Sequence, residues 1–241
     1  MDRVLARLAD MSGIACSARE RSASPGCRAP APWEVRARAL CWAVRPGAGA
    51  RAALEEVVAP QVRVNATPVM VVGALIRYEA TPVGPYDEVT AVVVHRRAGA
   101  LFATVPFMAV SSPAGLAAGR ENWALPKTLA RFTHEPRQAG EGGCGSHSAA
   151  VGDGWHIEVR EGGTGRIPMP VYVPGLLPLV QLGPGGTLHV TRVGARGLAR
   201  RAHVEVHVHA PPPLRAFFPA GRHTALLLTR LEVRLPPADR R

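Results

Sequence analysis

Apolar residues recur along the chain in short runs that turn residues separate. Each run is four to ten residues long, β-branched or aromatic residues are frequent in it, and Gly or Pro follows it or stands close by. This pattern is typical of strands rather than helices. We therefore predict a mainly β fold, an antiparallel β-barrel-like single domain with a few short helices. The predicted strands are Ala39–Val44, Val69–Tyr78, Val89–Val94 and Leu101–Val110.

Residues typical of turns and helices indicate where the predicted strands end. Residues 52–58 predict a short helix that stops at Pro60. Residues 81–85 and 96–99 predict turns, the second within a hairpin. The Gly- and Ser-rich residues 138–154 predict a flexible loop. The run 171–182 is too short, and too interrupted by prolines, to span a bilayer, and it predicts a packed wall of the core or of a pocket.

Residues 1–32 and 33–238 differ in composition and in the pattern of apolar residues. The first 32 residues are rich in Ala, Arg and Ser and show no sustained apolar face, so we expect a disordered tail, with organelle targeting left open. Folded structure is expected to begin near Trp33 and to form one domain over residues 33–238. The four cysteines have no metal-like spacing, which favours free thiols and a cytoplasmic protein.

Composition narrows the class of protein. The apolar content of 47% and the charged content of 20% are those of a soluble globular protein. The formal net charge is +11, and residues 185–241 hold ten arginines against three acids, a balance that attracts anions or a substrate carboxylate. A basic binding module led by these arginines stays an alternative. No nucleic-acid module and no membrane span is recognisable, so we predict neither partner.

Alternate histidines mark one late strand. His203, Glu205, His207 and His209 fall on one face, with valines on the other. Such histidines can chelate zinc, whereas a solvated outer face explains the same pattern. We favour the outer face and predict no metal and no cofactor.

Lys127 is the only lysine among 29 basic residues. A lysine amine can lose its proton and attack a carbonyl, which a guanidinium cannot do. Trp123, Leu125 and Pro126 are apolar neighbours that would lower the pKa of the amine by desolvation. A nucleophilic amine and a residual surface lysine, left by a coding bias towards arginine, both remain open from the residues alone.

Glu88 lies where a turn enters an apolar strand. Alternation places Tyr86, Glu88 and Thr90 on one face of that strand, with Asp87 and Val89 on the other. A carboxylate that faces an apolar interior needs a partner or a role. Proton transfer near the amine and an exposed acid at a strand end are the two open interpretations.

The segment Gly119-Arg120-Glu121, followed after four residues by Pro126-Lys127, resembles the active-site segment of the acetoacetate decarboxylase family. Residues 84–88, Gly-Pro-Tyr-Asp-Glu, are similar to the second signature of that family. The resemblance covers about residues 33–238. It implies a Schiff-base-forming carbon–carbon lyase that decarboxylates a β-keto acid through an imine on the lysine, without a cofactor, in a homo-oligomer. The implied catalytic residues are Lys127 and Glu88, and the implied substrate-binding residues are Arg120, Glu121, Trp123 and Tyr86.

Three positions depart from the family pattern. Thr128 stands where the decarboxylase has a second lysine, Gly73 where an acid is expected, and Arg36 and Arg38 are imperfect candidates for one arginine. Aldol or dehydration chemistry on another keto acid is therefore an alternative, as is a non-catalytic pocket protein that binds a small acid.

Overall fold

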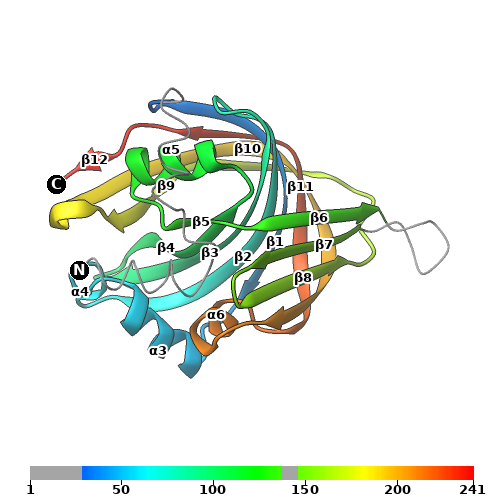
Figure 1. The fold of residues 1–241 in the computed structure, drawn as a ribbon, viewed down its shortest axis with the longest axis horizontal. Coiled ribbons are helices and arrows are strands. Elements are labelled where there is room, and N and C mark those ends of the chain that lie inside the picture. Colours follow the sequence, from blue (N-terminus) through cyan, green and yellow to red (C-terminus); the bar gives the residue numbers. More distant parts are fainter. Residues whose placement is uncertain (1–28, 137–145) are drawn as a thin grey trace.

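A computed structural model of the chain describes residues 29–136 and 146–241. One twelve-stranded sheet dominates it, in the order β11-β1-β2-β3-β4-β9-β10-β8-β7-β6, with β5 beside β4 and β12 beside β10 (Figure 1). The strands are β1 Trp33–Val44, β2 Thr67–Ala80, β3 Tyr86–Arg97, β4 Ala100–Val110, β5 Lys127–Leu129, β6 Arg131–Pro136, β7 Ser146–Gly152, β8 Trp155–Glu161, β9 Met169–Leu182, β10 Leu188–His209, β11 Gly221–Leu235 and β12 Asp239–Arg240.

The sheet curls into a ring. Strand β10 pairs with β11 as well as with β9, which joins the two ends of the run from β11 to β10. The backbones of β4 and β9 pair only at Ala103 and Leu179, in parallel orientation. The predicted mainly β fold is confirmed, but the ring is not a regular barrel, because one junction lacks a continuous ladder of hydrogen bonds.

Strands β6, β7 and β8 continue the sheet where β8 pairs with the end of β10, and they pack against the ring through Trp155, Ile157 and Val159 (Figure 1). Part of the predicted loop over residues 138–154 is therefore wrong, since Ser146–Gly152 form β7 between β6 and β8. Pairing on both sides outweighs the weak strand propensity of Gly and Ser. Residues 138–145 of that prediction lie outside the described residues.

Four short helices accompany the sheet in the described part of the chain: α3 Ala48–Val57, α4 Pro60–Arg63, α5 Pro113–Trp123 and α6 Pro212–Phe217. Helix α3 contains all but the last of the predicted residues 52–58 and ends before Pro60. Pro60 then begins α4 instead of only stopping a helix, because the first helical position needs no backbone N–H donor. Helix α5 carries the Gly-Arg-Glu motif and was not predicted.

The predicted strands are confirmed, each longer than expected. Strand β1 begins at Trp33, the expected start of folded structure, and residues 1–28 of the expected tail lie outside the described residues. On β10 the side chains of His203 and His207 are exposed while Val204 and Val206 are buried, as alternation predicts. No helix of the described chain is long and apolar enough to cross a membrane.

Strand β9 corrects the expectation of a packed wall over residues 171–182. Tyr172 and Leu176 are 75% and 78% exposed, so the first half of the strand presents apolar side chains to solvent. Val180 and Leu182 in the second half pack against the core. The prediction holds for the second half alone, because only there does β4 lie alongside.

The buried apolar residues form two main clusters on different sides of β3 and β4. The larger, here called the Trp42 core, contains Trp42, Val89, Phe107 and Phe218. The smaller, here called the Trp123 core, packs around α5 and contains Trp33, Tyr86, Val105, Met108, Leu116, Trp123 and Leu125. Successive residues of β3 and β4 serve alternate clusters, as the two-residue period of a strand requires.

Candidate active site

Helix α5 and a short connection bring Lys127 into the Trp123 core. The helix begins with Pro113 after Ser112, whose Oγ accepts a hydrogen bond from the N–H of Gly115 at 3.0 Å. It ends at Ala124 in the left-handed region, with φ of 54°. The chain reverses there, and Lys127 begins β5, opposite Met108 of β4.

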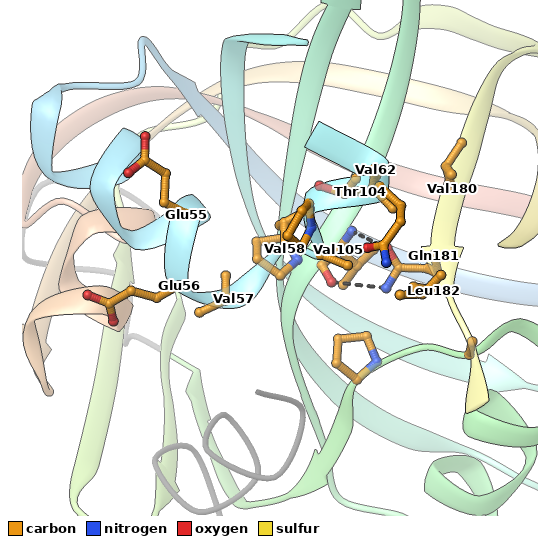
Figure 2. Close-up of a pocket in the computed structure, with 16 residues that line it drawn as sticks. Glu55, Glu56, Val57, Val58, Val62, Thr104, Val105, Val180, Gln181 and Leu182 are labelled. Carbon is orange, nitrogen blue, oxygen red and sulfur yellow. Dashed lines mark hydrogen bonds between the residues drawn. The ribbon is translucent and has the colours of Figure 1, made fainter. Parts of the chain in front are cut away.

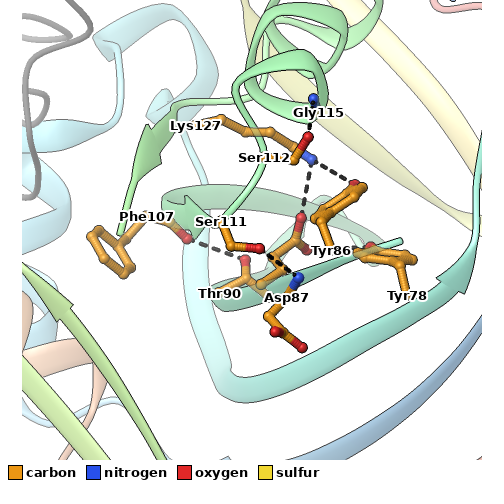
Figure 3. A network of polar contacts seen from close by, with 10 residues as sticks. Tyr78, Tyr86, Asp87, Thr90, Phe107, Ser111, Ser112, Gly115 and Lys127 are labelled. Atoms are coloured by element: carbon orange, nitrogen blue, oxygen red, sulfur yellow. Dashed lines mark hydrogen bonds and ion pairs between the residues drawn. The ribbon is translucent and has the colours of Figure 1, made fainter. Parts of the chain in front are cut away.

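The Lys127 amine lies against a carboxylate and a phenol (Figure 3). Its Nζ donates to Oε2 of Glu88 at 3.0 Å and to the hydroxyl of Tyr86 at 3.2 Å. Lys127 is 3% exposed and Glu88 2%. Behind the carboxylate, the hydroxyl of Tyr78 donates to Oε1 of Glu88 at 3.3 Å. Two residues singled out for acid–base chemistry therefore meet in the interior.

Strand β3 aims its side chains as alternation predicts. Tyr86 and Glu88 point to the amine, and Thr90, on the same face, donates its hydroxyl to the carbonyl of Phe107 at 3.1 Å. Asp87 points the other way, where Arg77 lies 3.1 Å from its carboxylate. The predicted faces of this strand are confirmed, and the buried position of Glu88 excludes its interpretation as an exposed acid.

Gly119 lets the lysine pass close to helix α5. A Cβ atom at this position would lie 2.5 Å from Cε and 2.6 Å from Cδ of Lys127, closer than carbon atoms pack. Gly115, one turn earlier, faces the ring of Tyr86, with 3.2 Å from a built Cβ to Cε1. The glycine of the Gly-Arg-Glu motif thus has a steric reason, which the sequence did not disclose.

The pKa of the Lys127 amine is shifted in the direction opposite to the one expected. Burial alone lowers the pKa of Lys127, but the carboxylate of Glu88 and the hydrogen bonds to Glu88 and Tyr86 together outweigh it, and the pKa is raised. The expected lowering is wrong because the apolar neighbours come with a buried counter-ion. Burial raises the pKa of Tyr86 to about 12, so its phenol keeps the proton at neutral pH.

The other three predicted site residues, Arg120, Trp123 and Glu121, differ in burial and in their contacts. Arg120 donates from Nε to the backbone carbonyl of Lys127 at 2.8 Å, tying the last turn of α5 to β5. Trp123 is 2% exposed, packs edge-on against Trp33 with ring centroids 5.2 Å apart, and donates from Nε1 to the carbonyl of Pro236. The side chain of Glu121 is exposed.

Tyr78 is the site residue that sequence reasoning missed. It lies opposite Tyr86 in the pairing of β2 with β3, and the ring centroids are 4.6 Å apart. Burial, followed by the charge of Glu88, raises the pKa of its phenol, which therefore stays protonated. Only its position opposite the Tyr-x-Glu motif marks Tyr78 as a site residue. That position cannot be recognised until the register of the two strands is known.

The departures at positions 73 and 128 also have structural explanations. A Cβ on Gly73 would lie 2.5 Å from the indole of Trp42, so this position has no room for an acid. Thr128 is 2% exposed and pairs with Ala109 of β4, so its side chain is enclosed. Among the described residues, no group of three or more His, Cys, Asp or Glu is arranged to hold a metal ion.

A cavity of about 430 Å³ borders the segment that carries the lysine (Figure 2). Ala124 and Pro126 line it from that segment. Its other walls come from residues 55–62, which are the end of α3, the two residues that follow it and the start of α4, from residues 104–106 of β4 and from residues 180–182 of β9.

Comparison with known proteins identifies relatives. The family model for acetoacetate decarboxylase matches residues 50–164. No curated protein sequence matches the chain. Solved structures that resemble it include the enduracididine biosynthesis enzyme MppR, complexed with the condensation product of pyruvate and imidazole 4-carboxaldehyde, with a TM-score of 0.65 and 12% identity over 91% of this chain and 92% of that one. Another is acetoacetate decarboxylase from Legionella pneumophila, with a TM-score of 0.61 and 16% identity over 90% and 89%. A third is an acetoacetate decarboxylase-like enzyme from Sphingomonas wittichii, with a TM-score of 0.59 and 12% identity over 90% and 96%.

Proposed function

We propose that the chain is a divergent member of the acetoacetate decarboxylase family and that it is a carbon–carbon lyase that decarboxylates a β-keto acid through an imine on Lys127. The observation that carries this proposal is the buried contact of 3.0 Å between the Lys127 amine and Glu88. An isolated ion pair in an apolar core costs more than it contributes unless it has a function or dense hydrogen bonding.

The first step is a proton transfer. The resting amine is an ammonium ion, because Glu88 raises its pKa. When a β-keto acid enters, the ammonium gives one proton to Glu88 along their hydrogen bond, and the free lone pair adds to the ketone carbon. The proton held by Glu88 and one proton of the nitrogen pass to the former ketone oxygen, which leaves as water, so a protonated imine forms and Glu88 is a carboxylate again.

The second step breaks the carbon–carbon bond. The electron pair of the bond to the carboxylate moves into the protonated imine, CO₂ leaves, and an enamine forms. A proton returns to the enamine carbon, and water then hydrolyses the imine to release the ketone and the lysine. This proton comes from solvent, and Glu88, the carboxylate nearest the nitrogen, is the group that can relay it.

Tyr86 contacts the same nitrogen and has a separate role. Its phenol lies 3.2 Å from Nζ and stays protonated, so it can donate to the oxygen that leaves as water. We assign Tyr86 to substrate contact, and Arg120 and Trp123 to positioning, because Arg120 holds the backbone of Lys127 and Trp123 anchors the end of α5. We assign no role to Glu121, because its side chain is exposed.

We further propose that residues 33–238 form the catalytic domain and that it works in the cytoplasm as a homo-oligomer. The exposed apolar side chains on the first half of β9, including Tyr172 and Leu176, support self-association, because a monomer rarely exposes such side chains together. Size-exclusion chromatography with light scattering tests this part.

Condensation or dehydration through the same imine is the second candidate. One structural neighbour holds a condensation product of pyruvate and an aldehyde. In this chain, Trp42 fills the space of an acid at Gly73 and Thr128 replaces the second lysine of the decarboxylase. The amine and the carboxylate needed for imine formation are retained. The two changes alter the side chains near them, on which the reaction of the imine depends.

Reductive trapping tests the proposal. The protein is incubated with acetoacetate, pyruvate or a longer keto acid, borohydride is added, and the adduct is located by peptide mass mapping. Because Lys127 is the only side-chain amine, the α-amino group of the chain is the sole competitor, and the Lys127→Arg variant is the control. An adduct on Lys127 with release of CO₂ supports decarboxylation. An adduct without CO₂ release favours the second candidate, and no adduct with any keto acid favours a non-catalytic binding protein.

A further inference from the structure

We propose that a cleft on the face of the sheet turned away from Lys127 binds the phosphate ester of a small hydroxylated molecule, such as a sugar phosphate. The cleft, here called the arginine cleft, has a volume of about 780 Å³, and Arg38, Arg77 and Arg200 line it. The inference is independent of the proposed function, because none of the residues proposed for imine chemistry lines this cleft. It concerns basic charge that the lysine chemistry does not use.

Two of the arginines lie side by side on neighbouring strands. Arg38 and Arg77 are opposite each other in the pairing of β1 with β2, and Arg77 is in turn opposite Asp87 of β3, so all three share one face of the sheet. Asp87 points away from the Lys127 amine, whereas its neighbour Glu88 points towards it. Arg38, a candidate for the arginine of the family pattern, therefore lies outside the proposed active site.

The third arginine, Arg200, reaches the cleft from β10. It lies opposite Leu227 of β11, and Leu227 lies opposite Leu40 of β1, two residues from Arg38 on the same face. Leu40 and Leu227 also line the cleft, so the floor between the arginines is apolar. Two strand spacings, roughly 10 Å, separate β10 from β1, and long side chains from both strands can contact one small ligand across this floor.

Two of the three arginines have no partner in the described part of the chain. Asp87 pairs with Arg77 at 3.1 Å, but no side chain of the described residues forms an ion pair or a hydrogen bond with the side chain of Arg38 or Arg200. Like charges directly opposite on paired strands destabilise a sheet, and Arg38 lies opposite Arg77. A concave surface that gathers such cations attracts an anion.

A phosphoryl group suits these arginines better than a carboxylate does. A phosphate monoester carries a charge of about −1.5 to −2 near neutral pH and presents three terminal oxygens. A carboxylate carries one charge and presents two oxygens in one plane. Guanidinium groups that approach from three different strands match the tetrahedral group, and each can donate two parallel hydrogen bonds to phosphate oxygens.

The opposite wall of the cleft is polar. Oγ of Ser148 on β7 lies 2.9 Å from Nδ1 of His134 on β6, and Nε2 of His134 lies 3.0 Å from the Asp87 carboxylate, which holds this wall against β3. Further along, Thr164 donates to Oε1 of Glu161 at 3.0 Å. These hydroxyl and carboxylate oxygens can accept further hydrogen bonds. The wall therefore suits ligand hydroxyl groups, and Glu161 disfavours a second anionic group.

The volume of the cleft indicates an organic ligand rather than an inorganic ion. About 780 Å³ falls within the roughly 300–1,000 Å³ that is usual for pockets of small organic ligands. A molecule with its phosphate at the arginines and its hydroxyl groups at Ser148, Thr164 and Glu161 contacts both walls.

Titration calorimetry of the whole chain tests the class of ligand. We expect glucose 6-phosphate or ribose 5-phosphate to bind with a Kd of about 1 mM or lower, and inorganic phosphate and gluconate to bind about tenfold more weakly or less well still. If neither sugar phosphate binds saturably, the inference is wrong. Inorganic phosphate that binds as tightly would overturn the hydroxylated ester, and gluconate that binds as tightly would overturn the choice of a phosphoryl group.

Two variants remove charge from the cleft, and one matched variant removes the same charge beside it. Arg38→Gln and Arg200→Gln should each raise the Kd of the sugar phosphate by about tenfold or more, the effect of losing a charged hydrogen bond. Arg201→Gln is the control, because Arg201 is exposed, follows Arg200 on the other face of β10 and does not line the cleft. Equal weakening by all three variants would mean that overall charge attracts the anion, and it would overturn the site.

Thermal unfolding shows whether the variants fold and gives a second measure. Without ligand, the Tm of Arg38→Gln should equal or exceed that of the wild type, because the like charge opposite Arg77 is removed. A lower Tm would contradict the absence of a partner for Arg38. The sugar phosphate should raise the Tm of the wild type and of Arg201→Gln, and raise that of the two cleft variants less. Borohydride trapping on Lys127 is separate, so failure of the imine chemistry and failure of this site are distinguishable.

Discussion

In both the Trp42 core and the Trp123 core, a large side chain packs against a glycine, but the packed side chains differ in kind. In each, a large side chain lies against a glycine of a neighbouring element, and a Cβ on that glycine would come within 2.5 Å of it. In the Trp42 core the glycine is Gly73 and the side chain is an indole. In the Trp123 core the glycine is Gly119 and the side chain is Lys127.

The difference lies in what the close approach buries. Beside Gly73 it buries an aromatic ring, which stabilises the fold through apolar contact. Beside Gly119 it buries an ammonium ion with Glu88, and desolvating two charges costs several kcal/mol unless their contact is close and well hydrogen-bonded. The comparison teaches that one core is built for stability and that the other gives up stability to hold a buried ion pair.

Replacement of Lys127, the proposed nucleophile, should have the largest effect. Lys127→Arg keeps the positive charge beside Glu88 and removes the primary amine, so we expect kcat to fall by about 10⁴-fold or more. The measurement is steady-state decarboxylation together with borohydride trapping. Turnover near that of the wild type would mean that the amine is dispensable.

The matched change Lys127→Met separates charge from chemistry. It leaves the Glu88 carboxylate buried without its counter-ion, so we expect a loss of roughly 3–5 kcal/mol of unfolding free energy, measured by urea denaturation. Lys127→Arg should lose less, since it retains the charge. Equal stability of the two variants would contradict a buried ion pair.

Removal of the counter-ion should change both rate and pH dependence. In Glu88→Gln the influences of the carboxylate that raise the pKa of Lys127 are lost while burial, which lowers it, remains. The amine should then become reactive at lower pH than in the wild type, whose pKa lies above the ordinary 10.5. Turnover should fall by about 10²–10⁴-fold, because the proton acceptor is gone.

The pH at which acetic anhydride labels Lys127, followed by the mass of its peptide, measures this shift. Glu88→Asp is the control, because it retains the charge on a shorter side chain. A labelling midpoint in Glu88→Gln that stays or moves to higher pH would refute the assigned cause of the raised pKa.

The two glycines provide a smaller and more selective test. Gly119→Ala places a methyl group against Cε and Cδ of Lys127 and should lower kcat by about tenfold to a hundredfold through displacement of the amine. Gly73→Ala meets the ring of Trp42 and should instead lower the unfolding free energy by about 1–3 kcal/mol. Paired kinetics and urea denaturation check both, and the reverse assignment of effects would break the distinction between the two cores.

Glu121 should show the smallest effect. Its side chain is exposed although it belongs to the Gly-Arg-Glu motif, so Glu121→Ala should change stability by less than about 0.5 kcal/mol. A loss of kcat above about tenfold would give this carboxylate a role that the single chain does not display, such as a contact within an oligomer.

Much of the architecture was predictable from local patterns. The strands β2, β3 and β4 and the turns between them follow from short apolar runs and from Gly and Pro. Strand β7 was missed because its Gly- and Ser-rich residues have little strand propensity of their own and pair with both β6 and β8. The beginning of α4 at Pro60 was missed because proline both ends and begins helices.

The candidate site was predictable in its members but not in its electrostatics. A lone lysine and an acid on the inner face of a strand single out Lys127 and Glu88. Their contact joins residues 39 positions apart, and it reverses the expected direction of the lysine pKa. Tyr78 joins the site only through the register of β2 with β3.

The sequence by itself determined which chemistry is available: one primary amine, one interior carboxylate, and strands that place residues on alternate faces, since these depend on residue type and two-residue period alone. The tertiary structure decided the charge state of the amine, the closeness allowed by Gly119 and the cavity beside Pro126. Each of these depends on distances between segments far apart in the chain, and Coulomb attraction, steric exclusion and cavity volume all follow from such distances.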